Sequence, residues 1–193
     1  MLIVDFLRHG ALQGGVKYRG TLDEPLTKQG HRQMDEVWAK VNGEVTMIIS
    51  SPLSRCAHPA GGWAEKNNIP LVVEDRIREL SYGDWEGLTA SQIQQKFPHQ
   101  LEAWREDPTD LTPPQGESMQ HFSSRIQSFW HDLLEKYDSE HILIVAHSGS
   151  IRLLLTHALH APIQSTRHFA MPYACWSRVQ VVEEKTQLAF HAR

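Results

Sequence analysis

Cysteine is scarce in this chain, with only Cys56 and Cys175 among its 193 residues. The two lie far apart in sequence, without the paired spacing of a zinc site or the density of a disulfide framework. We therefore expect two reduced thiols and a reducing compartment.

Long apolar runs are also missing. The apolar start, Met1 to Leu7, is interrupted by Asp5 and followed by Arg8, so it lacks the charged start and long apolar stretch of a signal peptide. No segment approaches the ~20 apolar residues that cross a bilayer as a helix. We expect a cytoplasmic protein without a membrane partner.

An excess of positive charge is absent too. Lys and Arg number 19 against 23 Asp and Glu, a formal net charge of -4. Extended nucleic-acid binding needs many cationic groups to neutralise backbone phosphates, so we expect no nucleic-acid partner.

Hydrophobic residues make up 40% of the chain, enough for one α/β domain over residues 1–193. Short apolar runs bounded by polar loops predict strands at 1–7, 46–50, 70–73 and 141–146. Helical spacing predicts helices over 28–42, from Pro52, over 117–137 and after His147. Alternation over 176–190 predicts a terminal hairpin. This order favours a three-layer α/β/α sandwich, its sheet mostly parallel with an antiparallel edge strand.

Two of the predicted strands end in a histidine. Arg8 and His9 follow the first strand, and His147 and Ser148 follow the fourth, while Arg55 comes shortly after the second. The carboxyl ends of parallel strands meet at one edge of a sheet, so these side chains should form one pocket.

The residue types in that pocket suit phosphoryl transfer. Guanidinium forks match phosphate oxygens, which assigns Arg8 and Arg55 to phosphate binding. Neutral imidazole is a nucleophile near pH 7, so His9 is the predicted attacking group. His147, together with the Ser148 and Gly149 amides at a helix start, is predicted to stabilise the phosphate's charge.

The leaving oxygen needs a proton, which a carboxyl group beside an apolar wall supplies. We choose Glu79 as this acid, with Asp84 and Glu86 as lesser candidates. For substrate binding we name Tyr18, Arg19, Gly20 and Tyr82; with Trp85, the aromatic side chains would stack on a base or line a sugar pocket. The region 88–116 is expected to cover the pocket as an insertion or lid.

Three segments resemble the signature blocks of the histidine phosphatase superfamily, the phosphoglycerate mutase-like proteins. They are Leu7-Arg8-His9-Gly10, Ser50-Ser51-Pro52-Leu53-Ser54-Arg55 and Val145-Ala146-His147-Ser148-Gly149. The resemblance spans nearly the whole chain. It implies a phosphorylated His9, phosphate ligands Arg8, Arg55 and His147, and the proton donor Glu79. A phosphohistidine intermediate needs no metal, so we expect neither metal nor cofactor.

The segments 14–20, 82–86 and 168–177 are similar to the α-ribazole phosphatase branch, which serves cobalamin synthesis. That resemblance implies a small phosphate ester as substrate, α-ribazole 5'-phosphate or cobalamin 5'-phosphate. The loop Ala11 to Gly15 departs from the family pattern, which usually has Glu and then Thr or Ser after Arg-His-Gly.

Other interpretations use the same residues. A mutase keeps His9 and Glu79 but returns the phosphoryl group to another hydroxyl of a carboxylated sugar acid. A broad-specificity or protein phosphatase needs the same chemistry, and an inactive module that binds phospholigands needs only the arginines. The chain has 12 histidines, so any single one is more often structural than catalytic. The conjunction of the four clusters favours an enzyme.

Overall fold

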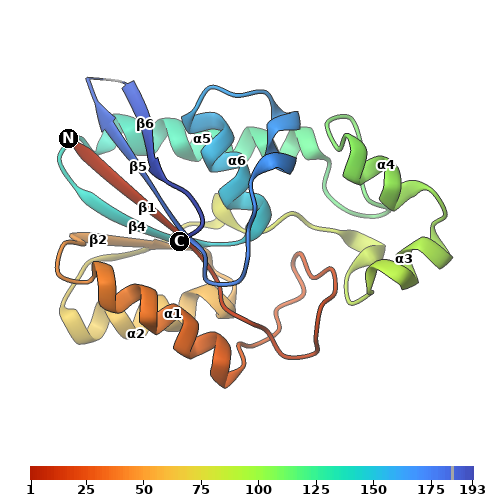
Figure 1. Cartoon of the computed structure of the whole chain (residues 1–193), viewed down its shortest axis with the longest axis horizontal. Helices are drawn as coiled ribbons and strands as arrows, with labels where there is room; N and C mark the ends of the chain where they lie inside the picture. The colour runs from red at the N-terminus through yellow and green to blue at the C-terminus, as the bar shows by residue number, and fades with distance from the viewer. Residues whose placement is uncertain (184) are drawn as a thin grey trace.

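The computed structural model describes residues 1–183 and 185–193, and a six-stranded sheet lies at its centre (Figure 1). The strand order is β3-β2-β4-β1-β5-β6. The strands are β1 (Leu2–Arg8), β2 (Met47–Ser50), β3 (Leu71–Val73), β4 (His141–Ala146), β5 (Trp176–Val182) and β6 (Lys185–Phe190). Strands β1 to β4 pair in parallel, while β5 pairs antiparallel with both β1 and β6. The predicted fold class and the terminal hairpin are confirmed.

Helices cover both faces of the sheet. Figure 1 shows α1 (Lys28–Val41) and α2 (Ser54–Asn67) on one face, and α5 (Met119–Lys136) and α6 (Ser148–Ala158) on the other. The side chains of β4 alternate between the two layers. Ile142 and Ile144 join the core under α5 and α6, while Leu143 and Val145 join the core under α1 and α2. Because both faces are covered, the strand is apolar at every position from Ile142 to Ala146.

Local signals set the ends of α1 as predicted. The Thr27 side chain accepts a hydrogen bond from the Gly30 amide and caps the helix. Met34, Val37, Trp38 and Val41 form its buried stripe. The last predicted residue, Asn42, is the C-cap.

The helix predicted to start near Pro52 is present as α2 and begins at Ser54, with Leu53 as its N-cap. The Asp23 carboxylate, from a distant loop, accepts hydrogen bonds from the Ser54 amide and hydroxyl at 2.9–3.0 Å. This tertiary contact satisfies a first-turn amide that the local sequence leaves without a partner.

Between β3 and α5 the chain forms short elements away from the sheet. The 3₁₀ turns Asp75–Ile77 and Gly83–Trp85 precede α3 (Ala90–Lys96) and α4 (Gln100–Glu106), which lie to the right in Figure 1. A third 3₁₀ segment, Ile163–His168, follows α6. Within the described residues, no helix is long and apolar enough to cross a membrane.

Candidate active site

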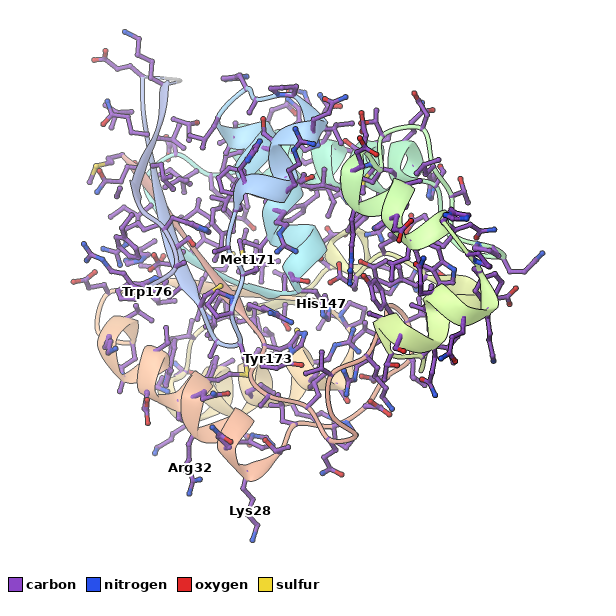
Figure 2. All side chains as sticks on the ribbon, turned by 45° about the vertical axis from the view of Figure 1, so that its right-hand side comes forward. Lys28, Arg32, His147, Met171, Tyr173 and Trp176 are labelled. Atoms are coloured by element: carbon purple, nitrogen blue, oxygen red, sulfur yellow. The ribbon has the colours of Figure 1, made fainter. Side chains whose placement is uncertain are left out.

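A cavity of about 500 Å³ opens where β1, β2 and β4 end. His9 follows β1, Ser51 follows β2 and His147 follows β4. Figure 2 labels His147 and Tyr173, whose ring centres lie 5.4 and 5.8 Å from that of His9. The cavity lies where an open α/β sheet places its ligands.

His9 lies in the cavity wall with only 5% of its surface exposed. Its Nδ1 lies 2.9 Å from the Gly10 carbonyl oxygen, which only accepts, so Nδ1 carries the proton and donates it. Burial and the nearby charges of Arg8 and Arg55 hold the pKa of His9 well below its ordinary value of 6.5. The ring is therefore neutral at pH 7, with a lone pair on Nε2, which is the state a nucleophile requires.

Arg8 and Arg55 line the same cavity as His9. The Arg8 guanidinium lies 4.4 Å from the centre of the Tyr173 ring and donates to the Met171 carbonyl oxygen. Its buried Nε has no partner in the described part of the chain. Arg55 is 1% exposed and donates to the Gly20 and Leu22 carbonyl oxygens at 2.7 and 2.9 Å. Contacts within the protein therefore hold both guanidinium groups in place.

His147 is fully buried and is not among the described residues that line the cavity. Arg55 Nε donates to its Nδ1 at 3.2 Å, and its Nε2 donates to Ser51 Oγ at 2.7 Å. Burial and Arg55 hold its pKa well below 6.5, so it accepts from Arg55 as a neutral ring. In this arrangement His147 orients Arg55, and its direct contact with phosphate stays a prediction.

Glu79 faces the first turn of α6. Its carboxylate accepts from the Ser148 hydroxyl at 3.3 Å and from the Gly149 and Ser150 amides at 3.1 and 3.2 Å. We predicted these helix-start donors for the phosphate, but the Gly149 amide and Ser148 hydroxyl are directed at Glu79 instead. A Cβ at position 149 would lie 2.4 Å from Glu79 Oε1, so a side chain there requires the Glu79 carboxylate to move.

An arginine that the sequence did not single out holds the backbone around Glu79. Arg125, on α5, donates to the carbonyl oxygens of Arg76, Arg78 and Glu79. Glu117 binds the same guanidinium through two contacts of 2.8 Å. In the sequence Arg125 is one more polar residue on an amphipathic helix, so no local signal marks it.

Most of the predicted substrate-binding residues line the cavity, as Tyr18, Arg19, Gly20 and Tyr82 do. Arg19 pairs with Glu24 at 2.6 Å and donates to the Gln13 and Gly15 carbonyl oxygens. It therefore organises the loop that departs from the family pattern.

Tyr18 and Tyr82 meet edge to face, with ring centres 5.1 Å apart. Burial raises the pKa of Tyr82, so its hydroxyl stays protonated as a donor.

The two lesser acid candidates lie outside the cavity lining. Asp84 is exposed to solvent. The Glu86 carboxylate accepts from the Thr21, Leu22 and Tyr82 amides at 2.7–3.0 Å and joins two loops. Glu79 is therefore the carboxylate in the described cavity wall.

The fold and these side chains place a neutral histidine in an arginine-rich pocket at the carboxyl ends of the strands. The chain belongs to the histidine phosphatase superfamily (branch 1), whose family model matches residues 4–192. Among the described residues, no group of three or more His, Cys, Asp or Glu side chains is placed to hold a metal ion.

Known relatives differ in their named activities. The chain is 28% identical over 178 residues to the adenosylcobalamin/alpha-ribazole phosphatase of Escherichia coli, covering 91% of this chain and 88% of that protein. It is 33% identical over 186 residues to a probable phosphoglycerate mutase of Proteus mirabilis, covering 93% and 85%. The solved structure of mycobacterial glucosyl-3-phosphoglycerate phosphatase with VO3 superposes with a TM-score of 0.88 at 28% identity, covering 99% of both chains.

Proposed function

We propose that this protein is a phosphomonoesterase that works through a phosphohistidine intermediate. One observation carries the proposal: a neutral His9, its Nε2 lone pair unused by the Gly10 contact, shares a cavity with Arg8, Arg55 and Glu79. Nucleophile, cationic oxygen ligands and acid are the parts that metal-free phosphoryl transfer requires.

In the first step His9 Nε2 attacks phosphorus in line and forms the N–P bond while the ester P–O bond breaks. Protonated Glu79 gives its proton to the departing oxygen. In the second step water attacks the phosphohistidine, the N–P bond breaks, and the Glu79 carboxylate accepts the proton from water. The donors at the start of α6 stabilise that carboxylate.

For the substrate we propose α-ribazole 5'-phosphate or cobalamin 5'-phosphate, in cytoplasmic assembly of the cobalamin nucleotide loop. Support comes from the named activity of the Escherichia coli relative and from the aromatic wall of Tyr18, Tyr82 and Trp104. The phosphoglycerate mutase and glucosyl-3-phosphoglycerate phosphatase relatives support a second candidate, a phosphorylated sugar acid.

Steady-state rates with α-ribazole 5'-phosphate and 3-phosphoglycerate test the substrate, with free phosphate and mutase product measured separately. Release of free phosphate supports the phosphomonoesterase, and formation of an isomerised phosphoglycerate supports a mutase. The absence of both products supports a module that only binds phospholigands.

His9→Ala should abolish turnover and the acid-labile phosphoenzyme, because it removes the attacking nitrogen. His31→Ala, at an exposed position of α1, is the matched control and should leave both unchanged. Full activity of His9→Ala would overturn the mechanism.

A further inference from the structure

Positive charge is concentrated in the cavity of a protein whose net charge is -4. Seven cationic residues line it: Arg8, Lys17, Arg19, Arg55, Arg105, Arg152 and Arg167. Among the described lining residues Glu79 is the one carboxylate. This excess of positive charge is larger than a single bound phosphate dianion would neutralise.

Four of these cations already have a role. Arg8 and Arg55 flank His9, while Arg19 and Lys17 both pair with Glu24. Arg105, Arg152 and Arg167 remain, and none of the three forms an ion pair with a carboxylate within the described residues. We call these three residues the arginine rim.

The arginine rim is assembled from three separate elements, α4, α6 and the 3₁₀ segment Ile163–His168. Arg167 Nη1 donates to the Glu106 carbonyl oxygen at 2.8 Å and joins that segment to α4. Arg152 Nε donates to the Phe169 carbonyl oxygen at 3.0 Å, which leaves both of its Nη groups for a ligand. Backbone contacts therefore position the guanidinium groups of Arg152 and Arg167.

A neighbouring acid does not neutralise the arginine rim. Hydrogen bonds from Thr109 lower the pKa of Asp107, and the charge of Arg167 lowers it further, so Asp107 and Arg167 are near each other. Asp107, however, lies outside the cavity lining, and its carboxylate accepts from the Thr109 amide and hydroxyl at 3.0 and 2.6 Å.

Apolar side chains line the cavity that Arg8, Arg55 and the arginine rim share. Tyr82, Trp104, Phe122 and Leu153 are among them. A ligand that fills this cavity therefore combines a phosphate ester, an uncharged body against the apolar wall and a second anion for the arginine rim. Guanidinium forks bind carboxylate and phosphate oxygens alike.

We propose that the arginine rim is a second anion subsite, which selects phosphate monoesters that carry a carboxylate or a second phosphate group. This inference rests on the proposed function and narrows its substrate class. Cobalamin 5'-phosphate carries a second anion, the phosphodiester of its nucleotide loop, whereas α-ribazole 5'-phosphate does not. The phosphorylated sugar acid also meets the requirement.

The test uses matched esters of different length: ω-phosphooxy carboxylic acids of two to six carbons, their methyl esters, and α,ω-bisphosphates of the same lengths. At the best length the acid or the bisphosphate should exceed the methyl ester in kcat/KM by about tenfold or more, the effect of a charge-assisted hydrogen-bonded contact. If the carboxylic acids have the higher kcat/KM, the second anion is a carboxylate; if the bisphosphates do, it is a phosphate.

Arg152→Met and Arg167→Met should each bring the ratio of acid to methyl ester toward one, and Arg152→Lys should retain part of it. Arg32→Met is the control and should leave the ratio unchanged, because Arg32 projects outward from α1 (Figure 2). Circular dichroism confirms that each variant is folded.

Two outcomes separate this inference from the proposed function. Equal kcat/KM for acid and methyl ester in the wild-type protein would overturn the subsite while leaving the phosphomonoesterase intact. Absence of turnover and of phosphohistidine would refute the phosphomonoesterase activity. Titration calorimetry would then test the second anion subsite by comparing the affinities of ω-carboxyalkyl phosphonates and of their methyl carboxylate esters. Equal affinities there would refute it.

Discussion

Replacement of Gly149 by alanine tests the position of the proposed acid without changing any charge. The new Cβ would lie 2.4 Å from Glu79 Oε1, 3.3 Å from its Cδ and 3.1 Å from Phe122 Cε1. An ordinary contact is at least 3.4 Å, so the Glu79 carboxylate must move by about 1 Å. A displacement of that size costs on the order of 100-fold in rate when the displaced group takes part in the reaction.

The fold should tolerate this change. Alanine is better than glycine in a helix by about 1 kcal/mol, which offsets part of the weakened hydrogen bonding to Glu79. Gly62→Ala is the matched control, because it is also a glycine within a helix and its Cβ would meet nothing within 4 Å. We expect both variants to unfold within a few degrees of the wild-type protein.

Rapid-quench single-turnover kinetics with two leaving groups provides the assay. An alkyl phosphate needs a proton on its departing oxygen, whereas 4-nitrophenolate leaves without one. Phosphorylation of His9 by the alkyl ester should therefore slow about 100-fold in Gly149→Ala, and phosphorylation by the nitrophenyl ester only a few-fold. A wild-type rate with the alkyl ester, or equal losses with both esters, would refute the assignment of Glu79 as proton donor.

Three further predictions concern stability and metal dependence. His9 and His147 have pKa values held well below 6.5, so only the unfolded chain takes up these protons near that pH. The free energy of unfolding should therefore fall below pH 6.5 by about 1.4 kcal/mol per pH unit for each histidine; urea titrations at pH 7.5, 6.5 and 5.5 measure this, and a flat profile would contradict it. Asp5→Asn removes the buried charge that accepts from Arg178 at 2.8 Å and His141 at 2.7 Å, which should cost about 3–5 kcal/mol by urea denaturation; a loss under about 0.5 kcal/mol would show that the pair contributes little. Turnover should survive EDTA, because arginines supply the positive charge, and reproducible loss reversed by a divalent cation would overturn the metal-free mechanism.

Elements with a strong local period were predictable from sequence. The apolar stripe of α5 indicates which side of the helix is buried, and the apolar run from Ile142 to Ala146 indicates a strand covered on both faces. Thr27 caps α1 through its own side chain. The start of α2 was not predictable, because its partner Asp23 lies 31 residues away in the chain.

The candidate site, like the fold, was predictable only in part from the sequence. Since parallel strands end at one edge of the sheet, the sequence was sufficient to bring His9, Arg8 and Arg55 into one predicted pocket. The expectation that the region 88–116 acts as a lid stays a prediction, although Ala90, Trp104, Arg105 and Pro108 line the cavity.

By itself, the sequence determined the layers, the strand ends and the residue types of the pocket, because burial periodicity and chain direction are local properties. Only the tertiary structure decided which donor meets which acceptor. In the folded chain the Gly149 amide donates to Glu79, and Arg55 donates to His147. Arg125 donates to the backbone carbonyl oxygen of Glu79. Such contacts join residues 46 to 92 positions apart, and their distances exist only once the sheet and helices have packed.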